Sequence, residues 1–149
     1  MIRAEDLTRA YPVLDAQAPA SDGADLLAAE DVEAVFVVQD DRLAGIVTDI
    51  GLLRFLLPGY LSEDETLARV LEEGVGASLW RGLNGKRIAD LLGGDPHDVP
   101  EVEADDTLIE VAVRMSRTGS FLVAVWRDGR LIGGITSSAL LTALRGERR

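Results

Sequence analysis

The feature that most constrains the fold of this chain is an internal repeat. Residues 11–57 align with residues 99–145 at a constant offset of 88 without gaps, and 13 of the 47 aligned positions are identical. Composition alone would give about four identities, so the two segments are interpreted as copies of one structural unit. The most similar block aligns residues 40–48 with residues 128–136. The chain is therefore expected to contain two equivalent units.

The second copy shows the pattern of secondary structure more strongly. Residues 105–107 carry side chains that cap helices, and the apolar spacing after them predicts a helix that ends near Gly119. The apolar runs 121–126 and 131–136 are separated by turn residues, which predicts a β-hairpin. A final helix is expected to begin at Ser137.

The first copy repeats this order of elements. Its hairpin strands are predicted over residues 34–39 and 43–48, with two aspartates at the turn. Its first helix is expected to be short, about ten residues, because Pro19 and Gly23 replace helix-forming residues. Its last helix is expected to present one apolar face, formed by Leu52, Leu53, Leu56 and Leu57.

A linker separates the two copies. Residues 62–65 form a capping box, which predicts a helix that ends at Gly74. Residues 77–83 are expected to add one helical turn that holds Trp80, and a turn is predicted at residues 84–85.

A second, shorter similarity helps to place the motif boundaries. Residues 86–92 resemble residues 2–7 in position and pattern, at an offset of 84. We therefore divide the sequence into a first motif (1–59), a helical linker (60–85) and a second motif (86–149).

Composition excludes several classes of protein. The chain has no cysteine and a single histidine, so a disulfide framework, a thiol nucleophile and a multi-histidine metal site are excluded. Its 26 acidic and 15 basic residues, with one lysine, give a net charge of −11, which argues against nucleic acid as a partner. The apolar runs are too short to span a membrane, and no secretory signal opens the chain, so we expect a cytoplasmic protein. The sequence offers no assembled nucleophile, base or metal site, so we do not expect an enzyme.

The duplicated hairpin carries a resemblance to a known family. In both copies the second hairpin strand contains a glycine (Gly45, Gly133) followed three residues later by a threonine (Thr48, Thr136), and a helix begins directly after it. This arrangement resembles a tandem cystathionine β-synthase (CBS) domain pair, the Bateman module, of the stand-alone bacterial type. The resemblance covers nearly the whole chain, and residues 60–84 form a linker of the kind that varies in the family. It implies an α/β (α+β) fold of two β-α-β-β-α units, packed through their sheets with pseudo-twofold symmetry.

The resemblance also implies a regulatory function. Members of the family bind AMP, ADP, ATP or S-adenosylmethionine in clefts between the two motifs and pass the binding state to a partner protein. It further implies a homodimer built through the motif helices, and an enzyme or a transporter as the protein partner. The positions that correspond to the family's ligand-binding residues are Leu14, Asp15, Val35, Thr48, Asp49, Val102, Glu103, Val123, Thr136, Ser137 and Ser138.

The sequence departs from the family pattern at the ribose-binding position. Members carry an aspartate three residues after the threonine, because a carboxylate can accept hydrogen bonds from two neighbouring hydroxyls. Here these positions are Gly51 and Ala139. Asp49 would in addition repel a polyphosphate in the first copy, so the second copy is the better candidate pocket.

Each candidate residue also has a simpler interpretation. Thr48 and Thr136 stand where a helix begins, and a threonine there commonly caps the helix. The acidic residues between positions 22 and 33 suit either a divalent cation or a solvated acidic face. Trp80 and Trp126 are expected in the core or at a dimer surface, and His97 in an exposed loop.

A second hypothesis for function follows from these interpretations. The chain would then be a ligand-independent module for dimerisation or protein interaction, with degenerate nucleotide sites. Its leucine-rich motif helices and the linker helix 62–73 would form the binding surfaces.

Overall fold

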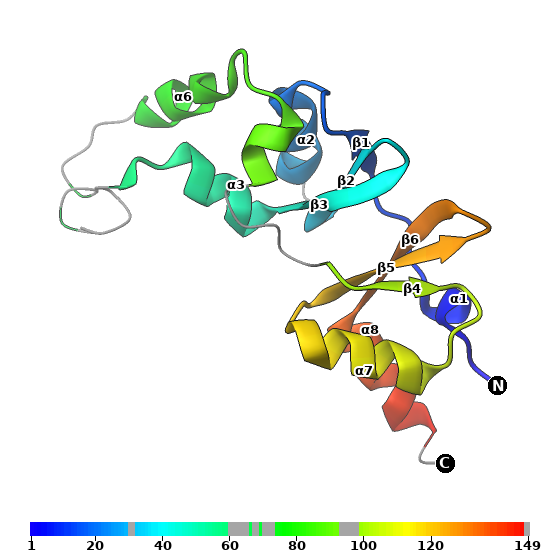
Figure 1. The fold of residues 1–149 in the computed structure, drawn as a ribbon. Coiled ribbons are helices and arrows are strands. Elements are labelled where there is room, and N and C mark those ends of the chain that lie inside the picture. Colours follow the sequence, from blue (N-terminus) through cyan, green and yellow to red (C-terminus); the bar gives the residue numbers. More distant parts are fainter. Residues whose placement is uncertain (30–31, 60–65, 67–68, 70–73, 93–98, 148–149) are drawn as a thin grey trace. The chain divides into compact units, whose positions relative to one another are not determined.

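The structure is a computed structural model that describes residues 1–29, 32–59, 66, 69, 74–92 and 99–147 (Figure 1). The chain divides into two compact units. Unit 1 consists of residues 1–11 and 98–149, and unit 2 consists of residues 12–97. Of the predicted linker helix 62–73, the structure describes residues 66 and 69, both as helical, and His97 lies outside the described residues.

Unit 2 contains the first copy of the repeat as a β-α-β-β-α unit. Strand β1 pairs in parallel with β2, and β2 pairs antiparallel with β3, so β2 is the central strand. The elements are β1 (Val13–Asp15), α2 (Ala20–Ala28), β2 (Ala34–Gln39), β3 (Arg42–Thr48) and α3 (Asp49–Leu56). Among the described residues that follow in the same unit are three short helices, namely α6 (Val75–Trp80), η1 (Arg81–Leu83) and η2 (Ile88–Leu92).

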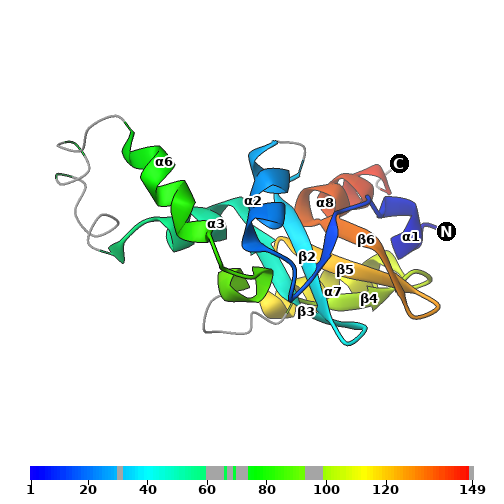
Figure 2. The same cartoon turned by 90° about the horizontal axis from the view of Figure 1, so that it is seen from above.

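Unit 1 contains the second copy with the same topology. Helices α7 and α8 pack against its sheet (Figure 1), and a short helix near the N-terminus, α1, lies against α8 and β4 (Figure 2). The elements are α1 (Ala4–Leu7), β4 (Glu101–Glu103), α7 (Leu108–Thr118), β5 (Leu122–Arg127), β6 (Arg130–Thr136) and α8 (Ser137–Gly146). The predicted α/β fold class with two β-α-β-β-α units is confirmed.

The two sheets repeat each other residue by residue. Val13 pairs with Phe36 in unit 2, and Glu101 pairs with Ala124 in unit 1, which is the same pairing shifted by 88. The hairpin register shifts once in each sheet, between Val37 and Val38 and at the equivalent position of β5. The constant offset read from the sequence therefore describes the structure as well.

Each unit has its own hydrophobic core. The central strands β2 and β5 each begin with four consecutive buried residues. The core of unit 2 includes Val35, Val37, Val47, Leu52 and Ile88, and the core of unit 1 includes Val111, Val123, Val125, Ile135 and Leu140. Burial of each such aliphatic side chain contributes about 1.5–3 kcal/mol, so these residues supply most of the stability of each unit.

A short segment from outside its own copy of the repeat completes each unit. The residues before the first copy complete unit 1, which contains the second copy, and residues 86–92, before the second copy, complete unit 2. The backbone N–H of Ala4 donates to the carbonyl of Asp106 at 2.8 Å, and that of Ile88 donates to the carbonyl of Ala18 at 2.8 Å. Arg3 and Arg87 make equivalent side-chain bonds: Arg3 donates to the Asp105 carbonyl in unit 1. The predicted similarity of residues 2–7 and 86–92 is therefore confirmed as structural equivalence. The division of the sequence after residues 59 and 85 stays a prediction, because the compact units do not follow chain order.

Candidate functional site

The two repeated threonines cap the helices that follow them. Thr48 Oγ1 accepts a hydrogen bond from the Gly51 N–H at 2.9 Å, and Thr136 Oγ1 accepts one from the Ala139 N–H at 3.1 Å. Both threonines have extended backbone angles and are half-buried. An N-cap of this kind stabilises a helix by about 1 kcal/mol, which is a sufficient structural reason for threonine at both positions. Each hydroxyl still has a hydrogen that it can donate.

The strand register shows which predicted site residues share one end of a sheet. In unit 2, Thr48 pairs with Ala34, next to Val35, whereas Asp15 pairs with Val38 near the hairpin turn. Four residues along a strand correspond to about 13 Å, so Leu14 and Asp15 do not lie beside Thr48 within this unit.

The same separation holds in unit 1. There Thr136 pairs with Leu122, and Glu103 pairs with Trp126 at the other end of the sheet.

Three of the predicted site residues belong to the cores. The side chains of Val35 and Val123 have no exposed surface, and Val102 is 3% exposed. They therefore offer no accessible side-chain surface to a ligand. Leu14 is half-buried and packs against the core of unit 2. The accessible predicted residues are Asp15, Thr48, Asp49, Glu103, Thr136, Ser137 and Ser138, all exposed or half-buried.

We call the end of each sheet at which Thr48 or Thr136 lies the threonine end. The residues found beside it are those that precede the first strand and those that precede the hairpin. In unit 1, the Ala124 N–H donates to the Pro100 carbonyl at 2.9 Å, and the Ser137 N–H donates to the Phe121 carbonyl at 2.8 Å. Sequence reasoning chose residues within the first strand instead. The signal that could have found this end is the repeated proline, Pro12 and Pro100, which is one of the 13 identities of the repeat.

The threonine ends of the two units differ in charge. In unit 2 the Asp49 N–H donates to the Glu33 carbonyl at 3.2 Å, so two acidic residues lie near the start of α3. The Asp49 carboxylate accepts the Ile50 N–H at 2.7 Å, and a negative charge in the first turn of a helix is stabilising. In unit 1 the equivalent positions are Phe121 and Ser137. An anionic ligand would therefore meet repulsion at this end of unit 2 and none from these positions in unit 1.

Hydroxyl groups gather at the start of α8 in unit 1. Thr136 Oγ1 and Ser138 Oγ are 3.2 Å apart, and Ser137 is half-buried beside them in the sequence. Phe121, whose carbonyl holds the Ser137 N–H, is 39% exposed. This end of unit 1 thus combines hydroxyl donors with an accessible aromatic ring.

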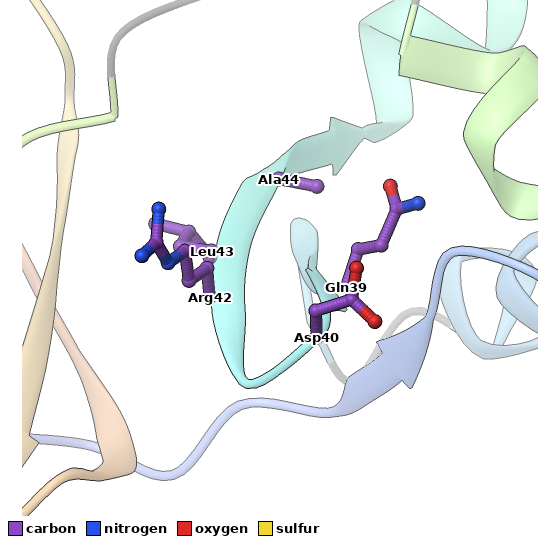
Figure 3. Close-up of a pocket in the computed structure, with 5 residues that line it drawn as sticks. All are labelled: Gln39, Asp40, Arg42, Leu43 and Ala44. Atoms are coloured by element: carbon purple, nitrogen blue, oxygen red, sulfur yellow. The ribbon is translucent and has the colours of Figure 1, made fainter.

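Two hollows lie among the described residues of unit 2, and neither is lined by a predicted site residue. The first has a volume of about 480 Å³ and is formed by the β2–β3 hairpin alone, from Gln39 to Ala44. Figure 3 shows the side chains of Arg42 and Leu43 on one side of the hairpin and those of Gln39 and Asp40 on the other. The second hollow lies beside the start of α2. Both are at the end of the sheet away from Thr48.

The two tryptophans are both partly accessible. Trp126 is half-buried, and its indole N–H donates to the Glu101 carboxylate at 3.0 Å, while Trp80 is 37% exposed on α6. Among the described residues there is no group of three or more acidic or histidine side chains that could hold a metal ion.

Within the same residues, none of the helices has the length and apolar character needed to cross a membrane.

Comparison with known proteins agrees with this architecture. The family model of the CBS domain matches residues 4–58 and 96–146. A CBS domain-containing protein of unknown function from Kribbella flavida is 32% identical, with a TM-score of 0.86 over 97% of this chain and 99% of that chain. The comparison with curated proteins gives no match.

More distant solved structures share the fold. The CBS domain of a CBS domain-containing membrane protein from Sphaerobacter thermophilus is 21% identical, with a TM-score of 0.72 over 95% of this chain and 87% of that chain. CBSX2, a CBS-pair protein from Arabidopsis thaliana, has been solved in complex with AMP; it is 21% identical, with a TM-score of 0.65 over 100% of both chains. With two matched segments on two equivalent β-α-β-β-α units, this chain belongs to the CBS-domain family as a tandem CBS pair.

Proposed function

We propose that this chain is a regulatory CBS-pair module that senses a small ligand of adenosine-nucleotide type and passes the binding state to a partner protein. Membership of the family and the AMP complex of the structurally similar CBSX2 support the class of ligand. The observation that carries the proposal is the acid-free group of hydroxyls at the start of α8, formed by Thr136, Ser137 and Ser138. Unit 1 is therefore the proposed ligand-binding unit.

The chemistry of this group suits a nucleotide. Hydroxyls donate hydrogen bonds to phosphate and ribose oxygens, and the start of a helix favours negative charge. The exposed ring of Phe121 offers an apolar face for a base. Because Ala139 replaces the family's aspartate, the ribose is held without a carboxylate, and we expect weak, millimolar binding.

Restoring the carboxylate tests this proposal. We expect Ala139→Asp to tighten the binding of AMP about tenfold in isothermal titration calorimetry, because a carboxylate that accepts two ribose hydroxyls adds charge-assisted hydrogen bonds. The chain accommodates a β-carbon at this position already. Gly51 is the less suitable position, since a β-carbon there would lie 3.1 Å from Thr48 Oγ1 and disturb the cap.

The control is Thr142→Asp, which adds the same charge to an exposed position of α8 one turn later. AMP, ADP, ATP, adenosine and S-adenosylmethionine are titrated into both variants and the wild type. Absence of heat for all five ligands at millimolar concentration would overturn the nucleotide proposal. If Ala139→Asp and Thr142→Asp bound AMP with equal affinity, the ribose would not lie beside residue 139.

A second candidate function is a ligand-independent module for dimerisation or protein interaction. The observation that favours it is the exposure of the equivalent residues Leu53 and Leu141, which are 53% and 66% exposed on α3 and α8. Single exposed leucines are ordinary, but the same leucine left exposed in both copies suits a repeated contact surface. Ile109 on α7 is also 63% exposed.

Light scattering with size-exclusion chromatography tests the second candidate. We expect a homodimer for the wild type and dissociation to monomers for the double variant Leu53→Lys/Leu141→Lys, because two charges would have to be buried in the interface. Thr142→Lys on α8 is the matched control and should leave the mass unchanged. A monomeric wild type that also captures no partner would contradict this candidate.

A further inference from the structure

The second hollow of unit 2 is basic, although the chain as a whole is acidic. It has a volume of about 420 Å³ and lies where the loop after β1 meets the segment before η2. Its lining residues are Gln17, Pro19, Ser21, Leu83, Asn84, Gly85, Lys86 and Arg87. Lys86 is the single lysine of a chain with net charge −11, and none of these lining residues is acidic.

Hydrogen bonds hold the backbone of the two basic residues, Lys86 and Arg87, in place. The Lys86 carbonyl accepts the Ala20 N–H at 2.9 Å, and the Lys86 N–H donates to the Leu83 carbonyl at 3.0 Å. The Arg87 guanidinium donates to the Gln17 carbonyl at 2.9 Å, and the Arg87 N–H donates to the Asp90 carboxylate at 2.8 Å. One N–H donor of the Arg87 guanidinium thus holds the loop. The side chains of Lys86 and Arg87 are both exposed, so the ammonium group and the other guanidinium donors are available to a ligand.

The equivalent place in unit 1 shows which of these residues the fold requires. Arg3 occupies the position of Arg87 and makes the same kind of bond, to the carbonyl of Asp105, at 3.1 Å. The loop is therefore held by an arginine in both units.

The remaining polar residues of the hollow have no such counterpart. Where unit 2 has Lys86, Gln17 and Ser21, unit 1 has Ile2, Asp105 and Ile109, respectively. A lysine, an amide and a hydroxyl are thus not needed to complete a unit of this fold. Their presence together in unit 2 needs another explanation.

We propose that this hollow binds a small phosphate-bearing anion. The lysine supplies a point charge, the guanidinium supplies directed N–H donors, and the amides of Gln17 and Asn84 and the hydroxyl of Ser21 supply neutral donors. Such a set matches the several acceptor oxygens of a phosphate group. The site lies in unit 2, at the hairpin end of the sheet, and does not depend on the function proposed for unit 1.

The test is a titration of the ¹⁵N-labelled full chain with inorganic phosphate at constant ionic strength, followed by the backbone amide signals of Gln17, Ser21 and Lys86. We expect these signals to shift in a saturable way, and Lys86→Ala to weaken the apparent affinity about tenfold, because a charge-assisted contact is lost. Arg42→Ala, which removes an exposed positive charge on the hairpin of the same unit, should leave the affinity unchanged. The hydrogen bonds of Lys86 to the fold are made by its backbone, so Lys86→Ala should fold normally.

Further arms separate the sources of the anion. Glycerol 3-phosphate saturating at lower concentration than inorganic phosphate would identify a phosphomonoester, and the reverse order would identify free phosphate. Shifts that do not saturate, or that are equal in Lys86→Ala and Arg42→Ala, would overturn the proposal. Adenosine, which has no phosphate, tests unit 1 separately through the signals of residues 136–139, so the two proposals fail independently.

Discussion

We expect Gly133→Ala to destabilise unit 1 by about 3 kcal/mol, the upper range for a side chain forced into occupied space. A β-carbon at this position would lie 2.2 Å from the Arg9 carbonyl oxygen and 2.9 Å from its carbonyl carbon. These atoms belong to the segment that pairs with β6, where Arg9 and Gly134 exchange two backbone hydrogen bonds of 2.9 Å. Because backbone atoms cannot rotate away as a side chain can, the substitution must displace the whole segment.

Gly45→Ala is the matched control, since Gly45 is the equivalent residue of the repeat. The two glycines have similar backbone angles, with φ of 158° and 154°, so the strain of placing alanine there is common to both variants. The nearest atom to a β-carbon at Gly45 is Leu92 Cδ2 at 3.0 Å, the end of a flexible side chain. We expect this variant to cost about 1–2 kcal/mol less than Gly133→Ala.

The measurement is urea unfolding followed by tryptophan fluorescence in a Trp80→Phe background, where Trp126 reports on unit 1. Hydrogen exchange provides a second readout, because the amides of Arg9 and Gly134 should lose protection in Gly133→Ala. Equal losses of stability in the two glycine variants would contradict the close approach of Arg9 to β6.

The repeat made most of this fold predictable from the sequence. The hairpin strand 34–39 is observed with the predicted bounds, and the predicted helix end at Gly119 is confirmed by a residue with φ of 68° that closes α7. These elements were predictable because turn chemistry and apolar periodicity act over a few residues. The similarity of residues 2–7 and 86–92 also had a local signal, in the aspartates Asp6 and Asp90 that cap both segments.

The assembly of the units was less predictable, because it depends on contacts between distant residues. Nothing local to residues 3–7 indicates that they pair with residues 104–106, about a hundred positions away along the chain.

The candidate site shows the same limit. Thr48 and Thr136 were found through the motif, but only the strand register shows that Asp15 lies at the opposite end of the sheet from Thr48. Burial likewise separates Val35 and Val123, which are core residues, from the exposed serine Ser138, although all three stand in or beside the hairpin motif. A motif identifies residue types along the chain, whereas accessibility is decided by packing.

The second large effect is expected for Ile88→Ala, which should lower the free energy of unfolding of unit 2 by about 3–4 kcal/mol. Ile88 has no exposed surface, and it packs in the core of unit 2 against residues of the first copy. Its side chain approaches Gly23 of α2 so closely that a β-carbon there would lie 2.5 Å from Ile88 Cδ1. Removing the side chain leaves a cavity between η2 and α2, because the backbone bond of Ile88 to Ala18 holds the segment in place.

Ile50→Ala is the matched control in the same unit. Ile50 is 52% exposed in the first turn of α3, and alanine is the better helix former, so its loss should change stability by less than about 0.5 kcal/mol. Urea unfolding of both variants is followed by Trp80 fluorescence in a Trp126→Phe background. Ile88→Ala is also measured in a Trp80→Phe background, where Trp126 reports on unit 1. The sequence similarity assigns residues 86–92 to the second motif, so a large loss in unit 2 with none in unit 1 is expected only if these residues complete the core of the first copy. Equal effects of Ile88→Ala and Ile50→Ala would show that residues 86–92 do not complete the core of the first copy.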